Sequence, residues 1–246
     1  MRQFNILTVY PDFFESFKNH GLIKKGLTKK IIQINIINIR DYTDDKHKRV
    51  DFKPYGGGAG MVIQYPPIKK ALESINTGKT VMLSPQGERL TQDKLNQLSK
   101  HKQINFICGR YEGVDQRIVD NLVDEEISIG DYVLSGGEIP AAAVIEGMTR
   151  LIPGVAENMT SIENESFSSF LLDYPTYTKP NLVDGLSVPE VLISGNHSEV
   201  ERWRRKNSLG ITMQKRPDLL KNVNLSKEDD RLLQEFIAEL TDDNCE

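Results

Sequence analysis

The sequence has little cysteine, no long apolar run and no large excess of one charge. Only two of its 246 residues are cysteines, Cys108 inside an apolar run and Cys245 next to the last residue. This excludes a disulfide framework and a zinc site made of cysteine pairs. No apolar run approaches the roughly 20 residues of a membrane helix, and the N-terminus has no signal-peptide cleavage pattern. We therefore expect a cytoplasmic protein without a membrane partner.

The net charge of −4 excludes a polycation, but the basic residues are unevenly placed. They gather at positions 24–30, 46–49 and 202–206. Local basic clusters on an acidic protein are compatible with a nucleic-acid partner. The alternative is that each cluster is only a solvated face.

Segments with the patterns of strands and helices alternate as far as residue 152. The patterns predict strands at 4–9, 31–39, 80–84, 104–108 and 126–129. They predict a short helix from Pro11 through Phe17 and further helices at 66–75, 91–100, 114–123 and 139–152. This alternation indicates an α/β fold, with a mostly parallel sheet and helices on both faces.

Three glycine-bearing turns follow three of these strands: SPQGE (84–88), CGRYEG (108–113) and IGDYVLSGGE (129–138). Ligands of open α/β sheets bind beyond the carboxyl ends of the strands, so the turns could line one pocket. None has the GxGxxG or GxxxxGK[ST] pattern of phosphate sites. A pocket walled mainly by backbone suits a flat, hydrogen-bonding group such as adenine, although each turn alone is more often an ordinary connection. A fourth cluster, PYGGGAGM (54–61), indicates either a close approach by another group or a tight turn.

The composition changes after residue 154. The stretch VAENMTSIENESFSS (155–169) is polar and has almost nothing to bury, which is typical of a mobile linker. We therefore divide the chain into a domain at 1–156, a flexible linker at 157–172 and a small helical C-terminal domain at 173–246.

Two helices are expected in the C-terminal domain. One begins at Asn196, with Glu199 at capping-box spacing, and should end before Gly210. The other covers 226–240 and has Ser226 and Asp229 as its cap pair. Three basic residues fall on one side of the first helix and are candidates for binding nucleic-acid phosphates: Arg202, Arg205 and Lys206.

Several of these motifs resemble, in the same order, those of the bacterial tRNA (guanine-N1)-methyltransferases, which belong to the SPOUT class. They are PYGGGAGM, LSPQG, CGRYEGVD, SIGDYVLSGGEIP, RLIPGV, LLDYPTYTKP and SGNHSEVERWRRKNSLG. The resemblance covers nearly the whole chain. It implies a homodimer with an active site shared between subunits, and a catalytic domain threaded as a deep trefoil knot, which the usual rules of chain connection would not suggest.

The resemblance also implies that the three turns bind S-adenosylmethionine in a bent form, with its adenine held by backbone groups. Side-chain bulk at Gly136 or Gly137 would then block the methyl donor. The matching positions are Leu83, Ser84, Pro85, Gly109, Tyr111, Glu112, Ile129, Gly130, Asp131, Tyr132, Val133, Leu134, Gly136, Gly137 and Pro140.

Methylation of guanine N1 needs a base for its proton and a positive group near O6. The resemblance assigns the positive group to Arg150 of RLIPGV. It assigns the base to an acid just before Ser-Phe, where the family usually has an aspartate and this sequence has Glu165. Glu163 and Asp173 are nearby carboxylates that do not match the family position.

The implied substrate is guanosine 37 in the anticodon stem-loop of tRNA, next to the anticodon, and the family's chemistry implies that Mg²⁺ can take part. Two alternatives stay open: a related SPOUT enzyme that methylates another RNA base, and a non-catalytic RNA-binding protein with the same fold.

Overall fold

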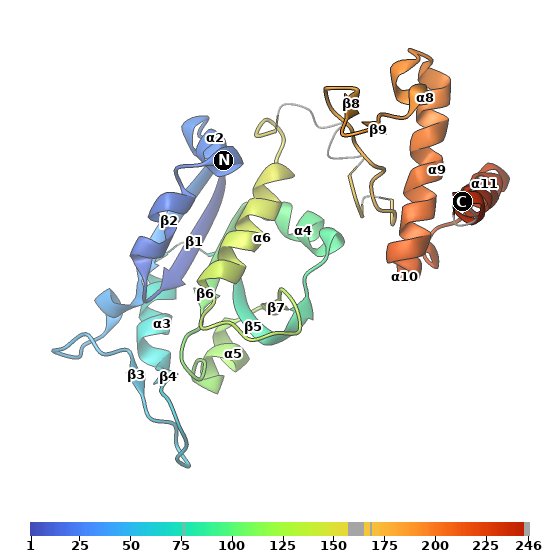
Figure 1. The fold of residues 1–246 in the computed structure, drawn as a ribbon. Coiled ribbons are helices and arrows are strands. Elements are labelled where there is room, and N and C mark those ends of the chain that lie inside the picture. The colour runs from blue at the N-terminus through green and yellow to red at the C-terminus, as the bar shows by residue number, and fades with distance from the viewer. Residues whose placement is uncertain (76, 157–164, 168, 244–246) are drawn as a thin grey trace. The chain divides into compact units, whose positions relative to one another are not determined.

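The computed structural model describes residues 1–75, 77–156, 165–167 and 169–243 (Figure 1). The chain forms two compact units, Met1–Glu157 and Asn158–Glu246. Glu163, one of the nearby carboxylates in the linker, lies outside the described residues.

The first unit is built on a parallel five-stranded sheet with the strand order β2-β1-β6-β5-β7. Each strand coincides with a segment where the sequence pattern predicts one, so the prediction of a parallel α/β sheet is confirmed. The strands are β1 (Arg2–Thr8), β2 (Ile32–Asn38), β5 (Lys79–Arg89), β6 (Gln103–Cys108) and β7 (Glu125–Ser128).

Helices cover both faces of this sheet, as expected (Figure 1). One face packs against α6 (Glu138–Arg150), with α1 (Phe14–Phe17), α2 (Gly21–Thr28) and α4 (Gln92–Ser99) beside it. Here Val144 and Met148 of α6 are fully buried in a cluster that includes Phe4 and Phe106 of the sheet. The other face packs against α3 (Tyr65–Glu73) and α5 (Gln116–Leu122).

A row of amide side chains crosses three neighbouring strands. The sequence Gln-x-Asn occurs at the start of β1, β2 and β6, and the register places the three asparagines opposite one another. Asn5 Nδ2 donates to Asn105 Oδ1 at 2.7 Å, and Asn35 Nδ2 donates to Asn5 Oδ1 at 2.8 Å. Because Asn5 and Asn105 are buried, a slipped strand would leave amides without partners, so this amide ladder fixes the register.

Strand β5 is longer than the sequence pattern predicts. It continues through Pro85 and Gly87 to Arg89, and its pairing with β7 shifts register between Leu83 and Glu88. SPQGE is therefore an irregularity within the strand rather than a turn after it. Glycine is required at 87, because a Cβ atom there would lie 2.3 Å from Ile127 N. Such bulges re-aim side chains beside functional sites.

The sequence pattern did not indicate several short elements of the first unit. They are α2, η2 (Ile39–Tyr42) and the antiparallel pair β3 (Asp51–Phe52) and β4 (Val62–Ile63). The short helix predicted from Pro11 through Phe17 is present as η1 (Pro11–Phe13) followed by α1. The β3–β4 pair carries the glycine cluster 54–61 in its connection.

The second unit contains the helices α8 (Glu190–Ile193), α9 (His197–Lys215), α10 (Pro217–Leu220) and α11 (Lys227–Asp243), and the strand pair β8 (Leu182–Val183) and β9 (Leu186–Ser187). Its core joins Leu171, Leu209 and Leu232. The two predicted caps are present: the Asn196 side chain accepts from Glu199 N, and Ser226 and Asp229 bond to each other.

The prediction that the helix beginning at Asn196 ends before Gly210 is wrong: α9 continues to Lys215. A Cβ atom on Gly210 would lie 2.3 Å from the ring of Phe236 in α11. The glycine therefore allows two helices to cross closely, and it does not terminate one. A glycine that usually marks a helix end serves here as a packing contact.

Part of the segment assigned to the linker, at 165–167 and 169–172, makes contacts within the second unit. Leu171 is buried, Leu172 N donates to Thr212 Oγ1 at 2.8 Å, and Phe167 N donates to Leu171 O at 2.8 Å. Residues before 173, where the sequence analysis begins the C-terminal domain, therefore already contact α9.

Candidate active site

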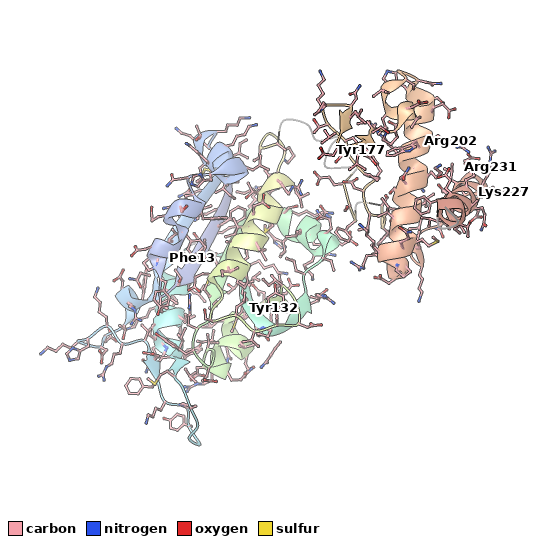
Figure 2. All side chains as sticks on the ribbon, viewed as in Figure 1. Phe13, Tyr132, Tyr177, Arg202, Lys227 and Arg231 are labelled. Atoms are coloured by element: carbon pink, nitrogen blue, oxygen red, sulfur yellow. The ribbon has the colours of Figure 1, made fainter. Side chains whose placement is uncertain are left out.

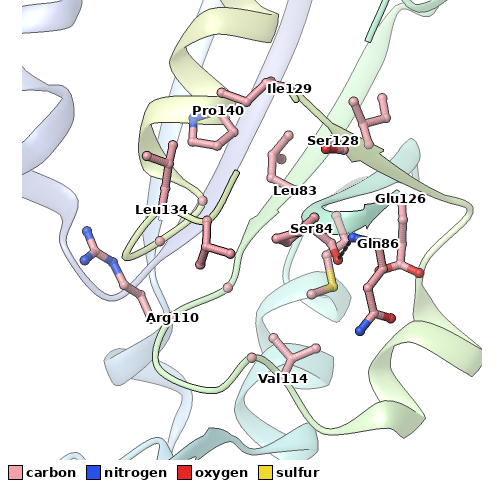
Figure 3. A pocket seen from close by; sticks show the side chains of 18 of the residues that line it. Leu83, Ser84, Gln86, Arg110, Val114, Glu126, Ser128, Ile129, Leu134 and Pro140 are labelled. Carbon is pink, nitrogen blue, oxygen red and sulfur yellow. Dashed lines mark hydrogen bonds between the residues drawn. The ribbon is translucent and has the colours of Figure 1, made fainter. Parts of the chain in front are cut away.

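A pocket of about 390 Å³ lies at the irregularity within β5 and at the carboxyl ends of β6 and β7 (Figure 3). It is lined by the three segments that the sequence analysis singled out, and by every predicted donor-binding residue except Asp131, which is exposed. Figure 3 shows Gln86 and Glu126 on one side of the pocket and Leu134 and Pro140 on the other. We call this the donor pocket.

Several lining residues were missed by the sequence analysis. The last residues of the strands contribute, as do the start of α5 and the residue after Gly109. They are Met82, Gln86, Arg110, Gly113, Val114, Gln116, Val119, Glu126, Ile127, Ser128 and Ser135. Most directly precede, follow or sit inside a predicted turn, so position next to the turn was the available signal.

Direct backbone contact holds two of the turns together. Gly137 N donates to Gly109 O at 2.9 Å, and Arg110 and Gly136 form an isolated bridge. A Cβ atom on Gly137 would lie 2.7 Å from Cys108 Cα, and one on Gly136 would collide with the Arg110 side chain. These glycines therefore allow the turns to meet, and the expectation that side-chain bulk at either position would block the methyl donor stays a prediction.

A buried carboxylate, that of Glu138, forms hydrogen bonds that hold the same turns in place. Glu138, at the start of α6, is 1% exposed and accepts hydrogen bonds from Arg110 Nε at 2.9 Å and from Thr8 Oγ1 at 2.7 Å. The Arg110 guanidinium also lies over the ring of Tyr10, 4.5 Å from its centroid. The network joins β1, the turn after β6 and α6.

Burial, and then the neighbouring Glu138, raise the pKa of the Cys108 thiol, so it stays protonated and is no nucleophile.

The glycine cluster 54–61 lies against the turn after β6. Glu112 N donates to Met61 O at 3.0 Å, and a Cβ atom on Gly60 would collide with the Glu112 side chain. Gly56 and Gly57 have φ near +80° with open space around them. Both readings of the cluster are therefore present: a tight turn at 56–57 and a close approach at 60.

The model of the family described as "tRNA (Guanine-1)-methyltransferase TrmD" matches residues 1–222. The chain belongs to this family.

Curated relatives of the family resemble the chain over nearly its whole length. A tRNA (guanine-N(1)-)-methyltransferase of Carboxydothermus hydrogenoformans is 51% identical over 238 residues, which is 96% of this chain and 94% of that protein. The protein of the same name from Caldanaerobacter subterraneus subsp. tengcongensis is 48% identical over 235 residues, 94% of this chain and 97% of its own.

The family resemblance gives catalytic roles to two side chains, Arg150 and Glu165. Arg150 is the last residue of α6, whose 13 residues span about 20 Å from the pocket end. Glu165 belongs to the second unit, where its charge acts on Asp173. Neither lines the pocket.

The three predicted phosphate-binding residues of α9 all point to carboxylates of α11. Arg202 bonds to Glu235 at 2.7 Å, Arg205 to Asp229 at 2.6 Å, and Lys206 to Glu239. Figure 2 shows Arg202 on the side of α9 that faces α11. The structure thus brings the three together on one side, as predicted, but compensates their charges within the unit.

In the part of the chain that the structure describes, no helix is both long and apolar enough to cross a membrane. Nor do those residues contain a group of three or more His, Cys, Asp or Glu side chains arranged to hold a metal ion.

Proposed function

We propose that this protein transfers the methyl group of S-adenosylmethionine, bound in the donor pocket, to N1 of guanosine 37 in tRNA. The observation that carries the proposal is the pocket itself, in a chain of the tRNA (guanine-1)-methyltransferase family. The proposal places the protein in the cytoplasm, where it meets tRNA.

The lining of the donor pocket fits the proposed donor. Backbone groups of the three turns can hydrogen-bond the edge of an adenine, and the volume is in the range of small-molecule sites. The donor carries positive charge on its sulfur and amino groups. Glu112, Glu126 and the rings of Tyr111 and Tyr132 line the same pocket, and carboxylates and aromatic faces both favour cations. When bound, the donor supplies an electrophilic methyl group.

The transfer needs two further functions, which the family resemblance assigns to residues outside the pocket lining. The guanidinium of Arg150 would stabilise the charge that develops at guanine O6 as N1 attacks. The carboxylate of Glu165 would accept the proton from N1. Asp131, which is exposed, remains part of the proposed donor site only through the backbone of its turn.

Arg150 supports the further proposal of a homodimer with a shared active site. Because α6 carries this side chain about 20 Å from the pocket of its own subunit, we propose that it completes the pocket of a second copy. Exposed apolar side chains near the pocket end of α6 are suited to such an interface: Tyr10, Phe13, Val133 and Ile139.

The trefoil knot implied by the family belongs to the same proposal. A knot needs the last two pocket turns to lie together, and the bridge between Arg110 and Gly136 joins them. The α9 residues Arg202, Arg205 and Lys206 remain proposed contacts to tRNA phosphates, for which tRNA would have to compete with α11. A role for Mg²⁺ is tested by comparing turnover before and after chelation.

The decisive experiment uses labelled S-adenosylmethionine and an unmodified tRNA transcript that has guanosine at position 37. We expect one methyl group per tRNA, and none on a matched transcript with adenosine at 37. Label on the control transcript would indicate a methyltransferase for another base. Tight tRNA binding with no label on either transcript would indicate a non-catalytic RNA-binding protein.

A further inference from the structure

Five basic residues gather at the amino-terminal edge of the sheet, opposite the donor pocket. The starts of β2, β1 and β6 are joined there: Arg2 N donates to Ile31 O at 2.7 Å, and Gln3 N donates to Lys102 O at 2.9 Å. Figure 1 shows the N-terminus beside α2 at this end. The set, which we call the basic edge, is Arg2, Lys29, Lys30, Lys100 and Lys102.

The charges of the basic edge are not compensated. The four lysines are exposed, and within the described residues none of the five forms an ion pair with a carboxylate. Farther along the same edge, at β5, Lys79 is paired with Glu125 at 2.7 Å. The basic residues of α9 are likewise paired, with α11. An uncompensated cluster on a chain with a net charge of −4 attracts a polyanion.

The basic edge lies at the same end of α6 as Arg150. Lys29 Nζ donates to Gly154 O at 3.0 Å, four residues after Arg150. In the proposed dimer, Arg150 reaches the guanosine in the pocket of the second copy. RNA bound at that pocket would therefore pass close to this edge.

We propose that the basic edge binds backbone phosphates of the substrate tRNA whose guanosine occupies the pocket of the other subunit. This inference rests on the proposed function. Phosphate contacts of this kind position a nucleic acid without reading its sequence, so the edge would anchor every tRNA substrate equally.

The test is a triple variant, Lys30→Gln, Lys100→Gln and Lys102→Gln. Among the described residues, these three side chains form no hydrogen bond or ion pair that stabilises the fold. The matched control removes the same charge from lysines that have carboxylate partners: Lys18→Gln, Lys69→Gln and Lys70→Gln. The dissociation constant for tRNA is measured without donor over a range of salt concentrations.

For the basic-edge variant we expect roughly tenfold or greater weakening at low salt. The slope of log K against log salt should fall by about 2 to 3, because each lost phosphate contact removes about 0.7 to 0.9. The control should keep the parental slope. An unchanged slope in the basic-edge variant, or an equal loss in the control, overturns the proposal. Direct binding needs no catalysis, so a protein that failed to methylate tRNA would still give this answer.

Mixed dimers test which subunit supplies the edge. One subunit carries Gly109→Leu, which fills its donor pocket, so only the other pocket turns over. The basic-edge substitutions should raise KM for tRNA when they are on the blocked subunit and leave it unchanged when they are on the active one. The reverse pattern, or equal effects, overturns the assignment to the opposite subunit.

Discussion

Glu165 and Asp173 are neighbouring carboxylates in the second unit. Asp173 N donates to Ser166 Oγ at 2.9 Å. Burial raises the pKa of Asp173, and the negative charge of Glu165 raises it further. Either carboxylate could accept a proton from a nearby guanine, so Asp173 is the rival of Glu165 as the base. The family position favours Glu165.

Glu165→Gln should therefore bind donor and tRNA almost as the parent does, yet lose about a hundredfold or more in turnover, the usual scale for a general base. Glu165→Asp should keep much of the activity, because it shortens the side chain by one methylene and preserves the carboxylate. Single-turnover methylation of guanosine 37 measures both.

Asp173→Asn is the matched control for that experiment. It removes a neighbouring charge without removing the proposed base, so its turnover should fall far less than that of Glu165→Gln. A collapse of the single-turnover rate in Asp173→Asn, together with survival in Glu165→Gln, would show that Asp173 is the base.

Two glycines of the donor pocket should respond differently to the same small change. A Cβ atom at Gly109 would meet only Met82 and Val114 at 3.6 and 3.8 Å, whereas one at Gly137 would lie 2.7 Å from Cys108 Cα. Gly109→Ala should keep the parental melting temperature. Gly137→Ala should lower it, because the two turns must separate, and should weaken donor binding with it. Thermal unfolding and calorimetric titration test this; equal melting temperatures would contradict it.

At the scale of elements, the contact between α9 and α11 is held by charge as well as by Leu209 and Leu232. Asp229 is its centre: it caps α11 through Ser226 and accepts from Arg205, and it is 7% exposed. The hydrogen bond from Arg205 lowers the pKa of Asp229 to about 2.

A lowered carboxylate pKa gives a definite pH dependence. The stabilisation by Asp229 is fully present above the unfolded value near 4 and is lost as pH falls through about 2. Asp229→Asn should therefore cost about 1 to 2 kcal/mol near neutral pH and progressively less below pH 4. Trp203, the single tryptophan of the chain, lies in this unit and reports its unfolding by fluorescence. A difference that does not shrink in acid would contradict the assignment.

The basic side of α9 gives a second prediction at this scale. Replacing Arg202, Arg205 and Lys206 by Ala removes three interhelical ion pairs, so the second unit should unfold at a lower temperature. If these residues also contact phosphates, tRNA binding should weaken and its salt slope should flatten, with donor affinity unchanged. A lower melting temperature with an unchanged salt slope, measured below that temperature, would show that they serve only the helix pair.

At the scale of the whole molecule, a shared active site predicts complementation. Dimers of Arg150→Ala alone, or of Gly109→Leu alone, should be inactive. A mixed dimer of the two keeps one intact site, because the open pocket of the Arg150→Ala subunit receives the arginine of the Gly109→Leu subunit. Turnover of about half the parental rate per dimer is expected for purified mixed dimers. Inactive mixed dimers would place Arg150 and the donor in the same subunit.

Local patterns in the sequence were enough for the sheet, for most of the helices around it and for the segments that line the pocket, but not for α2. Apolar alternation and glycine-bearing ends depend only on neighbours along the chain, so β1, β6 and α6 were predictable. Contacts between distant segments were not. From the sequence alone, Gly210 has the features of a helix end, because its contact with Phe236 is not visible there. Arg202 likewise has the features of a free cation, because its partner Glu235 lies far along the chain. Arg150 was assigned from the family, and nothing in its local sequence indicates a catalytic role.

The amide ladder of β1, β2 and β6 constrains how this protein can change in evolution. Losing Asn5 alone would strand the amides of Asn35 and Asn105, and a buried amide without a partner costs about 1 to 3 kcal/mol. Replacing the whole row by apolar residues could be nearly neutral. Substitution of the row one residue at a time would pass through less stable proteins. The three asparagines should therefore be kept among descendants, even though an apolar row would stabilise the sheet as well.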